Sequence, residues 1–212
     1  MTTSQISYPW SEIIDWKSEE FDRDGFQWTR YIGPGGTEIN IADDATIGYD
    51  AHIGPGVHIG SRSSIGPGAH IGGGTTIGGD SYIGPGAHIG LGVTIGDGVH
   101  IGSRSSIGPD VTIGGGVTLG DDSYIRPSVT IRPGVTIGPG TTIGDGATIG
   151  DGATIGGDSY IGPDVTIGPG VTIGDDAYVR SSVTIGDGTT IGRGTTIGSR
   201  AYIGDDTTID HD

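Results

Sequence analysis

Three histidines that recur at a constant interval are the first residues to consider for chemistry. His52, His70 and His88 are evenly spaced along the chain, and each is followed by isoleucine and glycine. An imidazole can act as a general base or bind a metal near neutral pH, so these three are the candidates for a catalytic base. Zinc needs ligands that converge tetrahedrally, whereas side chains on a straight ladder point parallel. We therefore favour stacked surface histidines, predict no metal site, and can name no partner carboxylate.

Tyrosine and arginine form a second group of candidates. Tyr124 is followed by Arg126 and Tyr178 by Arg180, and Tyr160 lies between these two pairs. Each arginine replaces a glycine that is usual at this point of the sequence pattern. Because tyrosine and arginine are enriched at protein interfaces, these five residues are predicted to form a binding face. Its partner is either an acidic or sugar ligand or another subunit.

An apolar residue at every sixth position must determine where these side chains lie. From Ile47 to Ile209 it is isoleucine except at Leu119 and Val179, and a small or β-branched residue stands two positions before it. In a triplet such as 165–167, the first and third side chains point inward and the middle one outward. Glycine and proline then turn the chain. Each hexad is thus one short strand and one corner, and it can bury its apolar face only in stacked coils.

These tandem hexads resemble the hexapeptide-repeat proteins. The resemblance rests on HIGPGA-type units around His70 and Tyr82 and on the run TIGDGATIGDGATIG from Thr142 to Gly156. It implies an all-β fold, the left-handed parallel β-helix, with three hexads per coil and about ten coils. Most characterised members of this superfamily are acyltransferases. They use a catalytic histidine, acetyl-coenzyme A as cofactor and a site between the subunits of a trimer.

With three hexads per coil, the outward side chains form three columns, two of them rich in threonine. The first ladder contains Thr76, Thr94, Thr112, Thr130, Thr148, Thr166 and Thr184, and the second contains Thr118, Thr136, Thr154, Thr172 and Thr190. Stacked threonines favour adjacent strands. The alternative is an ice-binding face, which resembles the threonine ranks of insect antifreeze solenoids. Those faces present two outward rows, whereas glycine nearly always occupies the second outward site here.

Residues 1–38 have a different composition and are predicted to cap the repeat region, 39–212. The spacing of Trp10, Ile13, Ile14 and Phe21 predicts an amphipathic helix that begins after Pro9. A short strand, 26–29, follows it. The first coil of a solenoid exposes unpaired backbone groups and an open core, which such a segment can cover. No comparable helix follows the last hexad, which is therefore expected either to remain open or to dock on another molecule.

Composition excludes several classes of partner and leaves the compartment open. The net charge of −16 with a single lysine argues against nucleic acid and anionic membranes as partners. No apolar run approaches the roughly 20 residues that span a bilayer, and no signal-peptide pattern is present. We therefore expect a soluble chain, cytoplasmic by default. The absence of cysteine excludes disulfides and thiolate chemistry.

The repeat runs from Ile41 to Ile209 without one inserted residue, so no catalytic loop can shape a pocket for acetyl-coenzyme A. The sequence accordingly favours a non-catalytic structural or surface-binding solenoid without cofactor that self-associates, as a homotrimer or by end-to-end stacking. A hexapeptide acyltransferase and an ice-binding protein are the alternatives. The unbroken regularity is also compatible with an idealised or engineered repeat.

Overall fold

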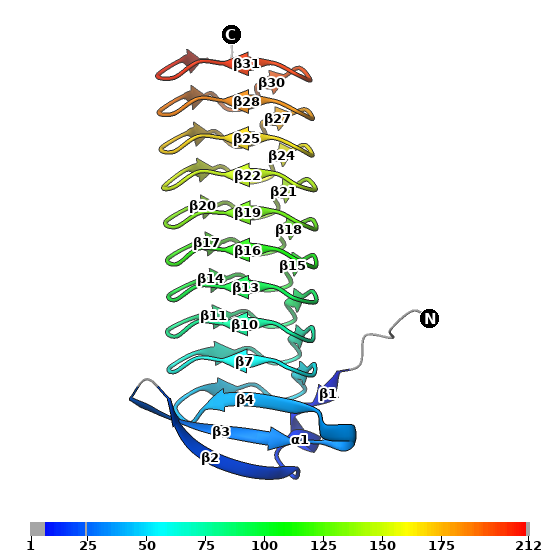
Figure 1. Cartoon of the computed structure of the whole chain (residues 1–212). Helices are drawn as coiled ribbons and strands as arrows, with labels where there is room; N and C mark the ends of the chain where they lie inside the picture. The colour runs from blue at the N-terminus through cyan, green and yellow to red at the C-terminus, as the bar shows by residue number, and fades with distance from the viewer. Residues whose placement is uncertain (1–6, 24, 211–212) are drawn as a thin grey trace.

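The computed structural model describes residues 7–23 and 25–210. These residues form a three-sided column of stacked coils with a small cap at its N-terminal end (Figure 1). Almost every hexad contributes a two-residue strand and a turn. The predicted fold class is confirmed: the chain is a left-handed parallel β-helix.

Each side of the column is one sheet, and apart from the cap strands β1, β2 and β3 the strands of a sheet come from every third hexad. Sheet A contains β1 (Tyr8–Pro9), β6 (His52–Ile53), β9 (His70–Ile71), β12 (His88–Ile89), β15 (Ser106–Ile107), β18 (Tyr124–Ile125), β21 (Thr142–Ile143), β24 (Tyr160–Ile161), β27 (Tyr178–Val179) and β30 (Thr196–Ile197). Sheet B contains β2 (Lys17–Arg23), β3 (Phe26–Ile32), β4 (Glu38–Ala42), β7 (His58–Ile59), β10 (Thr76–Ile77), β13 (Thr94–Ile95), β16 (Thr112–Ile113), β19 (Thr130–Ile131), β22 (Thr148–Ile149), β25 (Thr166–Ile167), β28 (Thr184–Ile185) and β31 (Tyr202–Ile203). Sheet C contains β5 (Thr46–Ile47), β8 (Ser64–Ile65), β11 (Tyr82–Ile83), β14 (His100–Ile101), β17 (Thr118–Leu119), β20 (Thr136–Ile137), β23 (Thr154–Ile155), β26 (Thr172–Ile173), β29 (Thr190–Ile191) and β32 (Thr208–Ile209).

The register between coils is constant. Thr76 pairs with Thr94 and Ile77 with Ile95, in parallel, and the same offset of three hexads continues along all three sheets. Outward side chains of one sheet therefore stand directly above one another. This offset confirms the coil length that the resemblance implied.

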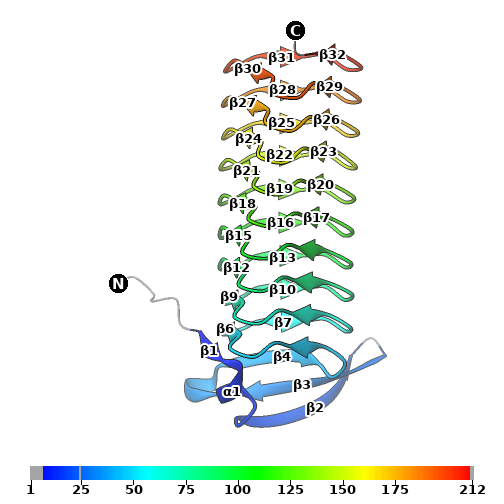
Figure 2. The same ribbon diagram turned by 180° about the vertical axis from the view of Figure 1, so that it is seen from behind.

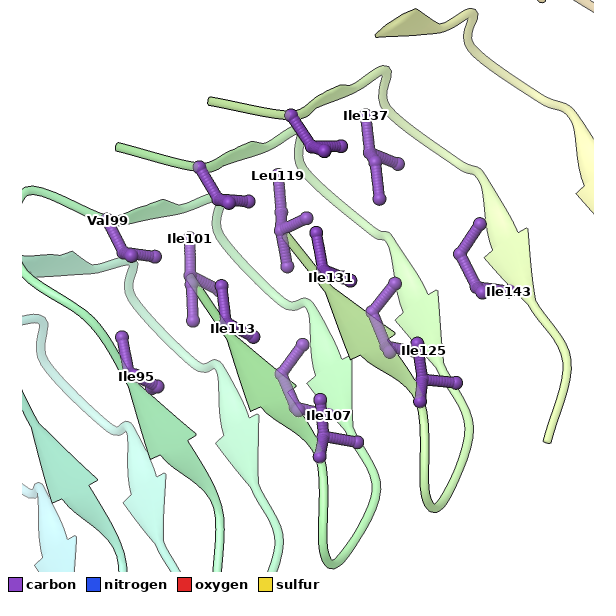
Figure 3. Packing of buried hydrophobic residues seen from close by; sticks show 14 of the residues in the cluster. Ile95, Val99, Ile101, Ile107, Ile113, Leu119, Ile125, Ile131, Ile137 and Ile143 are labelled. Atoms are coloured by element: carbon purple, nitrogen blue, oxygen red, sulfur yellow. The ribbon is translucent and has the colours of Figure 1, made fainter. Parts of the chain in front are cut away.

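The core is a column of isoleucines inside the three sheets. In Figure 3, Ile95, Ile113 and Ile131 form a row, one from each successive coil, and each is 1% exposed. Most hydroxyls that replace the small apolar residue donate to a corner carbonyl of the next coil, as Ser63 Oγ does to Gly78 O at 2.7 Å, whereas Thr195 Oγ1 is buried without a partner among the described residues. Buried hydroxyls need such partners, so the polar substitutions are accommodated without breaking the core.

The corners explain the demand for glycine after the core residue. A Cβ on Gly54 would lie 2.4 Å from Gly73 N of the next coil, so the two backbones approach too closely for a side chain. The residue two positions after this glycine, at the end of the turn, instead needs a positive φ, which glycine and aspartate tolerate best. It is 72° at Gly56 and 55° at Asp50.

The cap differs from the predicted amphipathic helix. Helix α1 spans only Trp10–Ile13, and the predicted strand after it is part of a long hairpin, β2–β3, whose strands pair from Lys17 with Ile32 to Arg23 with Phe26. Phe21, expected on the helix, stacks on Trp28 across this hairpin at 6.4 Å. The helical prediction failed beyond Ile13 because the paired positions and aromatic cross-strand contacts stabilise the strand. A 3-10 turn, η1 (Pro34–Gly36), follows β3.

Helix α1 and the hairpin lie under the first coil (Figure 2). Ile13 is fully buried, and Trp10 meets Tyr31 edge to face at 5.6 Å. These side chains pack against the isoleucine core from below. In the described residues, no helix has the length and apolarity needed to cross a bilayer.

Candidate functional site

The three candidate histidines form a stacked column on sheet A. The ring centroids of His52 and His70 are 4.7 Å apart with the planes at 3°, and those of His70 and His88 are 4.7 Å apart at 6°. The strands β6, β9 and β12 impose this spacing because their registers pair the histidines directly. The imidazoles therefore stand parallel, as the sequence predicts.

The ring of His52 is oriented by a contact with the nearby backbone. Its Nδ1 lies 3.1 Å from the backbone carbonyl of Asp50, to which it can donate when it carries the proton, leaving Nε2 as an acceptor. The pKa of His70 is lowered, first by partial burial, which disfavours the charged ring, and then by His88 and His52. A neutral imidazole at His70 suits a base or a hydrogen-bonding surface.

Carboxylates in the corners serve the backbone of the neighbouring coil. Asp121 Oδ1 accepts from Ser103 N at 2.7 Å, and Asp175 Oδ1 accepts from Gly157 N at 2.8 Å. Within residues 7–23 and 25–210, no group of three His, Cys, Asp or Glu side chains is placed to hold a metal ion.

The predicted Tyr–Arg face divides into two parts. Tyr160 stacks on Tyr178 at 4.7 Å and 14°, and with Arg180 they line a shallow depression of about 390 Å³. Arg126 instead folds over its own Tyr124, with its Cζ 5.5 Å from the ring centroid. The parts are separate because Thr142 lies between Tyr124 and Tyr160 in the sheet.

The threonine ladders follow two different sides of the column. Thr94 pairs with Thr112 on sheet B, and Thr154 pairs with Thr172 on sheet C. Each strand presents one outward threonine, and glycine follows the buried residue except at Arg132. The ladders are therefore single rows, and ice binding remains a prediction.

Sequence reasoning missed two features. Arg132 occupies the same glycine position as Arg126 and Arg180, which the pattern of the hexads could have revealed. A depression of about 560 Å³ also lies where the β2–β3 hairpin meets the first coils, lined among others by Trp28 and Arg62. No periodic signal could indicate it because residues 17–23, the first strand of the hairpin, were predicted as part of a helix, so no hairpin was expected here.

A comparison with models of protein families found a match to the repeat region. The model of the family described as "Bacterial transferase hexapeptide (six repeats)" matches residues 38–73, 74–107, 98–133, 122–157 and 152–187. The chain belongs to the bacterial transferase hexapeptide family. A comparison with curated proteins found no match.

Solved structures with the hexapeptide fold include two close in shape. LpxA, a UDP-N-acetylglucosamine acyltransferase from Bacteroides fragilis, is 23% identical with a TM-score of 0.56, and the match covers 72% of this chain and 64% of that one. An Arabidopsis UDP-N-acetylglucosamine acyltransferase is 18% identical with a TM-score of 0.50, covering 85% and 68%. A perosamine N-acetyltransferase from Caulobacter crescentus is 23% identical with a TM-score of 0.46, covering 55% of this chain and 52% of that one. The present chain thus spans only part of such proteins, and the likeness concerns the fold.

Proposed function

We propose that this protein is a non-catalytic, surface-binding β-solenoid that self-associates through the Tyr160–Tyr178 region of sheet A. The observation that carries the proposal is the stack of half-buried Tyr160 on exposed Tyr178, which lines a shallow depression with Arg180. Tyrosine and arginine are the residue types that most often supply binding energy at protein interfaces.

The position of Arg180 supports selection for binding rather than for folding. It stands where most hexads have glycine, because the coils approach closely there, as at Gly162, whose Cβ would lie 2.8 Å from Arg180 C. The bond from Arg180 N to Ile197 O is 3.0 Å, whereas that from Gly186 N to Ile203 O is 2.8 Å. Arg180 departs from the glycine pattern without shortening the backbone hydrogen bond between coils. Such a departure points to a functional site.

Self-association is tested by the mass of the protein in solution. A homotrimer gives a fixed mass at three times the monomer value, whereas end-to-end stacking gives a mass that grows with concentration. Light scattering of the wild type and of Tyr178→Ser is expected to show an assembly that the variant loses. Tyr202→Ser is the matched control because Tyr202 is a 76% exposed tyrosine on sheet B. A wild-type monomer at all concentrations would refute self-association.

A hexapeptide acyltransferase is the second candidate, and one observation favours it. The contact between His52 Nδ1 and Asp50 O directs Nε2 away from the backbone, which is the arrangement that a general base needs. Such an enzyme would bind acetyl-coenzyme A beside His52, His70 or His88, at an interface between copies. Isothermal calorimetry with coenzyme A distinguishes the two candidates. Absence of heat at millimolar ligand supports the non-catalytic solenoid, and saturable heat that is lost in His52→Asn, His70→Asn or His88→Asn supports the enzyme.

A further inference from the structure

The junction between cap and prism holds a depression that the proposed function does not use. It lies where the end of the β2–β3 hairpin projects past the corner of the prism (Figure 1), between sheets B and C and not on the sheet A binding region. Its volume is about 560 Å³, which is within the usual range for small-molecule sites. Phe26 and Trp28 line it from the hairpin, and Arg62, Asp80 and Asp97 line it from the corners of successive coils.

The walls of this junction site are held in place by contacts within the protein. Arg62 donates to Asp80 through Nε at 2.7 Å and through its Nη2 at 2.6 Å, and its guanidinium lies 5.7 Å from the centre of the Phe26 ring. Arg23 lies 5.9 Å from the centre of the Trp28 ring. Planar groups fixed in this way lose little entropy when a ligand binds.

His58 forms part of the same wall and is also fixed. Its Nε2 lies 3.2 Å from Asn40 Nδ2, and its Nδ1 lies 3.2 Å from Gly56 O. An amide nitrogen only donates, so Nε2 accepts and Nδ1 carries the proton. Asn40 is held in turn by Arg30, whose Nε donates to Asn40 Oδ1 at 3.3 Å.

Two polar groups at the junction have unused hydrogen-bonding capacity. The indole Nε1 of Trp28 is shielded from solvent and has no hydrogen-bond partner in the described part of the chain, which is costly unless an acceptor reaches it when a covering side chain moves aside. Asp97 accepts from Gly79 N through Oδ1 at 2.7 Å, and its carboxylate borders the same space. A carboxylate has lone pairs for more than one donor.

The charges of the lining balance. Arg23 and Arg62 oppose Asp80 and Asp97, so the site gives no reason to prefer an anion. A ligand that fits must accept from an indole N–H, donate to a carboxylate and place an apolar face against an aromatic ring. A sugar ring has all three properties because its hydroxyls both donate and accept. We propose that the junction site binds a neutral saccharide unit, with Trp28 and Asp97 as its polar anchors.

The test uses the full-length protein and three methyl glycosides, those of α-D-glucopyranose, α-D-mannopyranose and β-D-galactopyranose. The chain has three tryptophans, so nitrogen-edited NMR shows few indole signals, and the one missing in Trp28→Phe is that of Trp28. Titration with at least one glycoside, up to about 50 mM so that a millimolar dissociation constant is detected, is expected to shift the Trp28 signal. If none of the three glycosides shifts the Trp28 signal, the proposal is overturned.

Variants separate binding from folding. Asp97→Ala is expected to weaken the glycoside by about tenfold or more, since hydrogen bonds to charged groups are strong. Asp175→Ala is the matched control because Asp175 makes the same bond to the coil below, from Gly157 N at 2.8 Å, away from the junction. Equal loss in both variants overturns the proposal. So does binding of glucose 6-phosphate alone, because the site would then select an anion.

Trp28→Phe provides an independent readout. It keeps an aromatic ring but removes the unpartnered N–H, so glycoside binding measured by calorimetry is expected to fall roughly threefold to tenfold while thermal stability does not decrease. Unchanged affinity in this variant contradicts the role given to the indole. All of these measurements are independent of the oligomeric state tested above.

Discussion

At the scale of single residues, the glycine after each core isoleucine is the position that the stacking of coils constrains most. The Cβ of an alanine at Gly54 would lie 2.4 Å from Gly73 N, whereas the equivalent Gly198 has nothing within 4 Å. Gly54→Ala is therefore expected to lower the free energy of unfolding by about 1–3 kcal/mol, the usual cost of overpacking. Urea denaturation measures it. Gly198→Ala is the control, and an equal loss in both variants would contradict the steric explanation.

His70 gives a prediction about pH. Its pKa is lowered in the folded protein, chiefly by burial, so the unfolded chain takes up the proton first as the pH falls. The stability that neutral His70 contributes is present above the unfolded pKa of about 6.5 and is lost as the pH falls through that value toward the folded one. The melting temperature of His70→Thr should thus decrease less than that of the wild type between about pH 7.5 and 5.5. Equal decreases in the two melting temperatures would contradict the lowered pKa of His70 in the folded protein.

The sequence predicted residue positions well wherever the hexad continues. The stack of His52, His70 and His88 follows from their even spacing at every third hexad, and the structure has that stack. The junction site was not predicted because it depends on Trp28 and Arg62, which lie far apart in the chain and belong to different patterns. Only the three-dimensional placement of the hairpin brings them together.

At the scale of elements, two-residue strands are stable only through the core that they share. Ile137 is 1% exposed and lies among the isoleucines of neighbouring coils (Figure 3). Ile137→Ala is expected to cost about 2–5 kcal/mol, because the cavity cannot close between fixed strands. Chemical denaturation followed by circular dichroism measures the loss. Ile14→Ala, at a 52% exposed residue, should change stability by less than about 0.5 kcal/mol, and a similar loss there would contradict this account.

The cap shows why local periodicity is a weaker guide than a repeat. Trp10, Ile13 and Phe21 fit one face of a helix, but Phe21 also pairs across from Trp28, and the pairing prevails. Gly25 has a φ of 81°, which suits the turn of a hairpin. A single short segment is compatible with both a helix and a strand. The unbroken run of hexads from Ile47 to Ile209 is compatible only with repeated short strands and turns.

At the scale of the whole molecule, charge opposes the association proposed for sheet A. The net charge is −16, so two copies repel each other at low ionic strength. Salt shortens the screening length from about 10 Å at 0.1 M to about 3 Å at 1 M, whereas the contact itself would rest on tyrosine stacking and burial, which salt does not weaken.

Sedimentation equilibrium should therefore show tighter association as sodium chloride rises from about 0.05 to 0.5 M, since screening removes the repulsion. Tyr178→Ser is expected to remain dissociated at both concentrations, and Tyr202→Ser to follow the wild type because it leaves sheet A intact. Weaker wild-type association at high salt would mean that ion pairs hold the assembly. Arg180 and the aspartates of a neighbouring copy would then be the groups to test in place of the tyrosines.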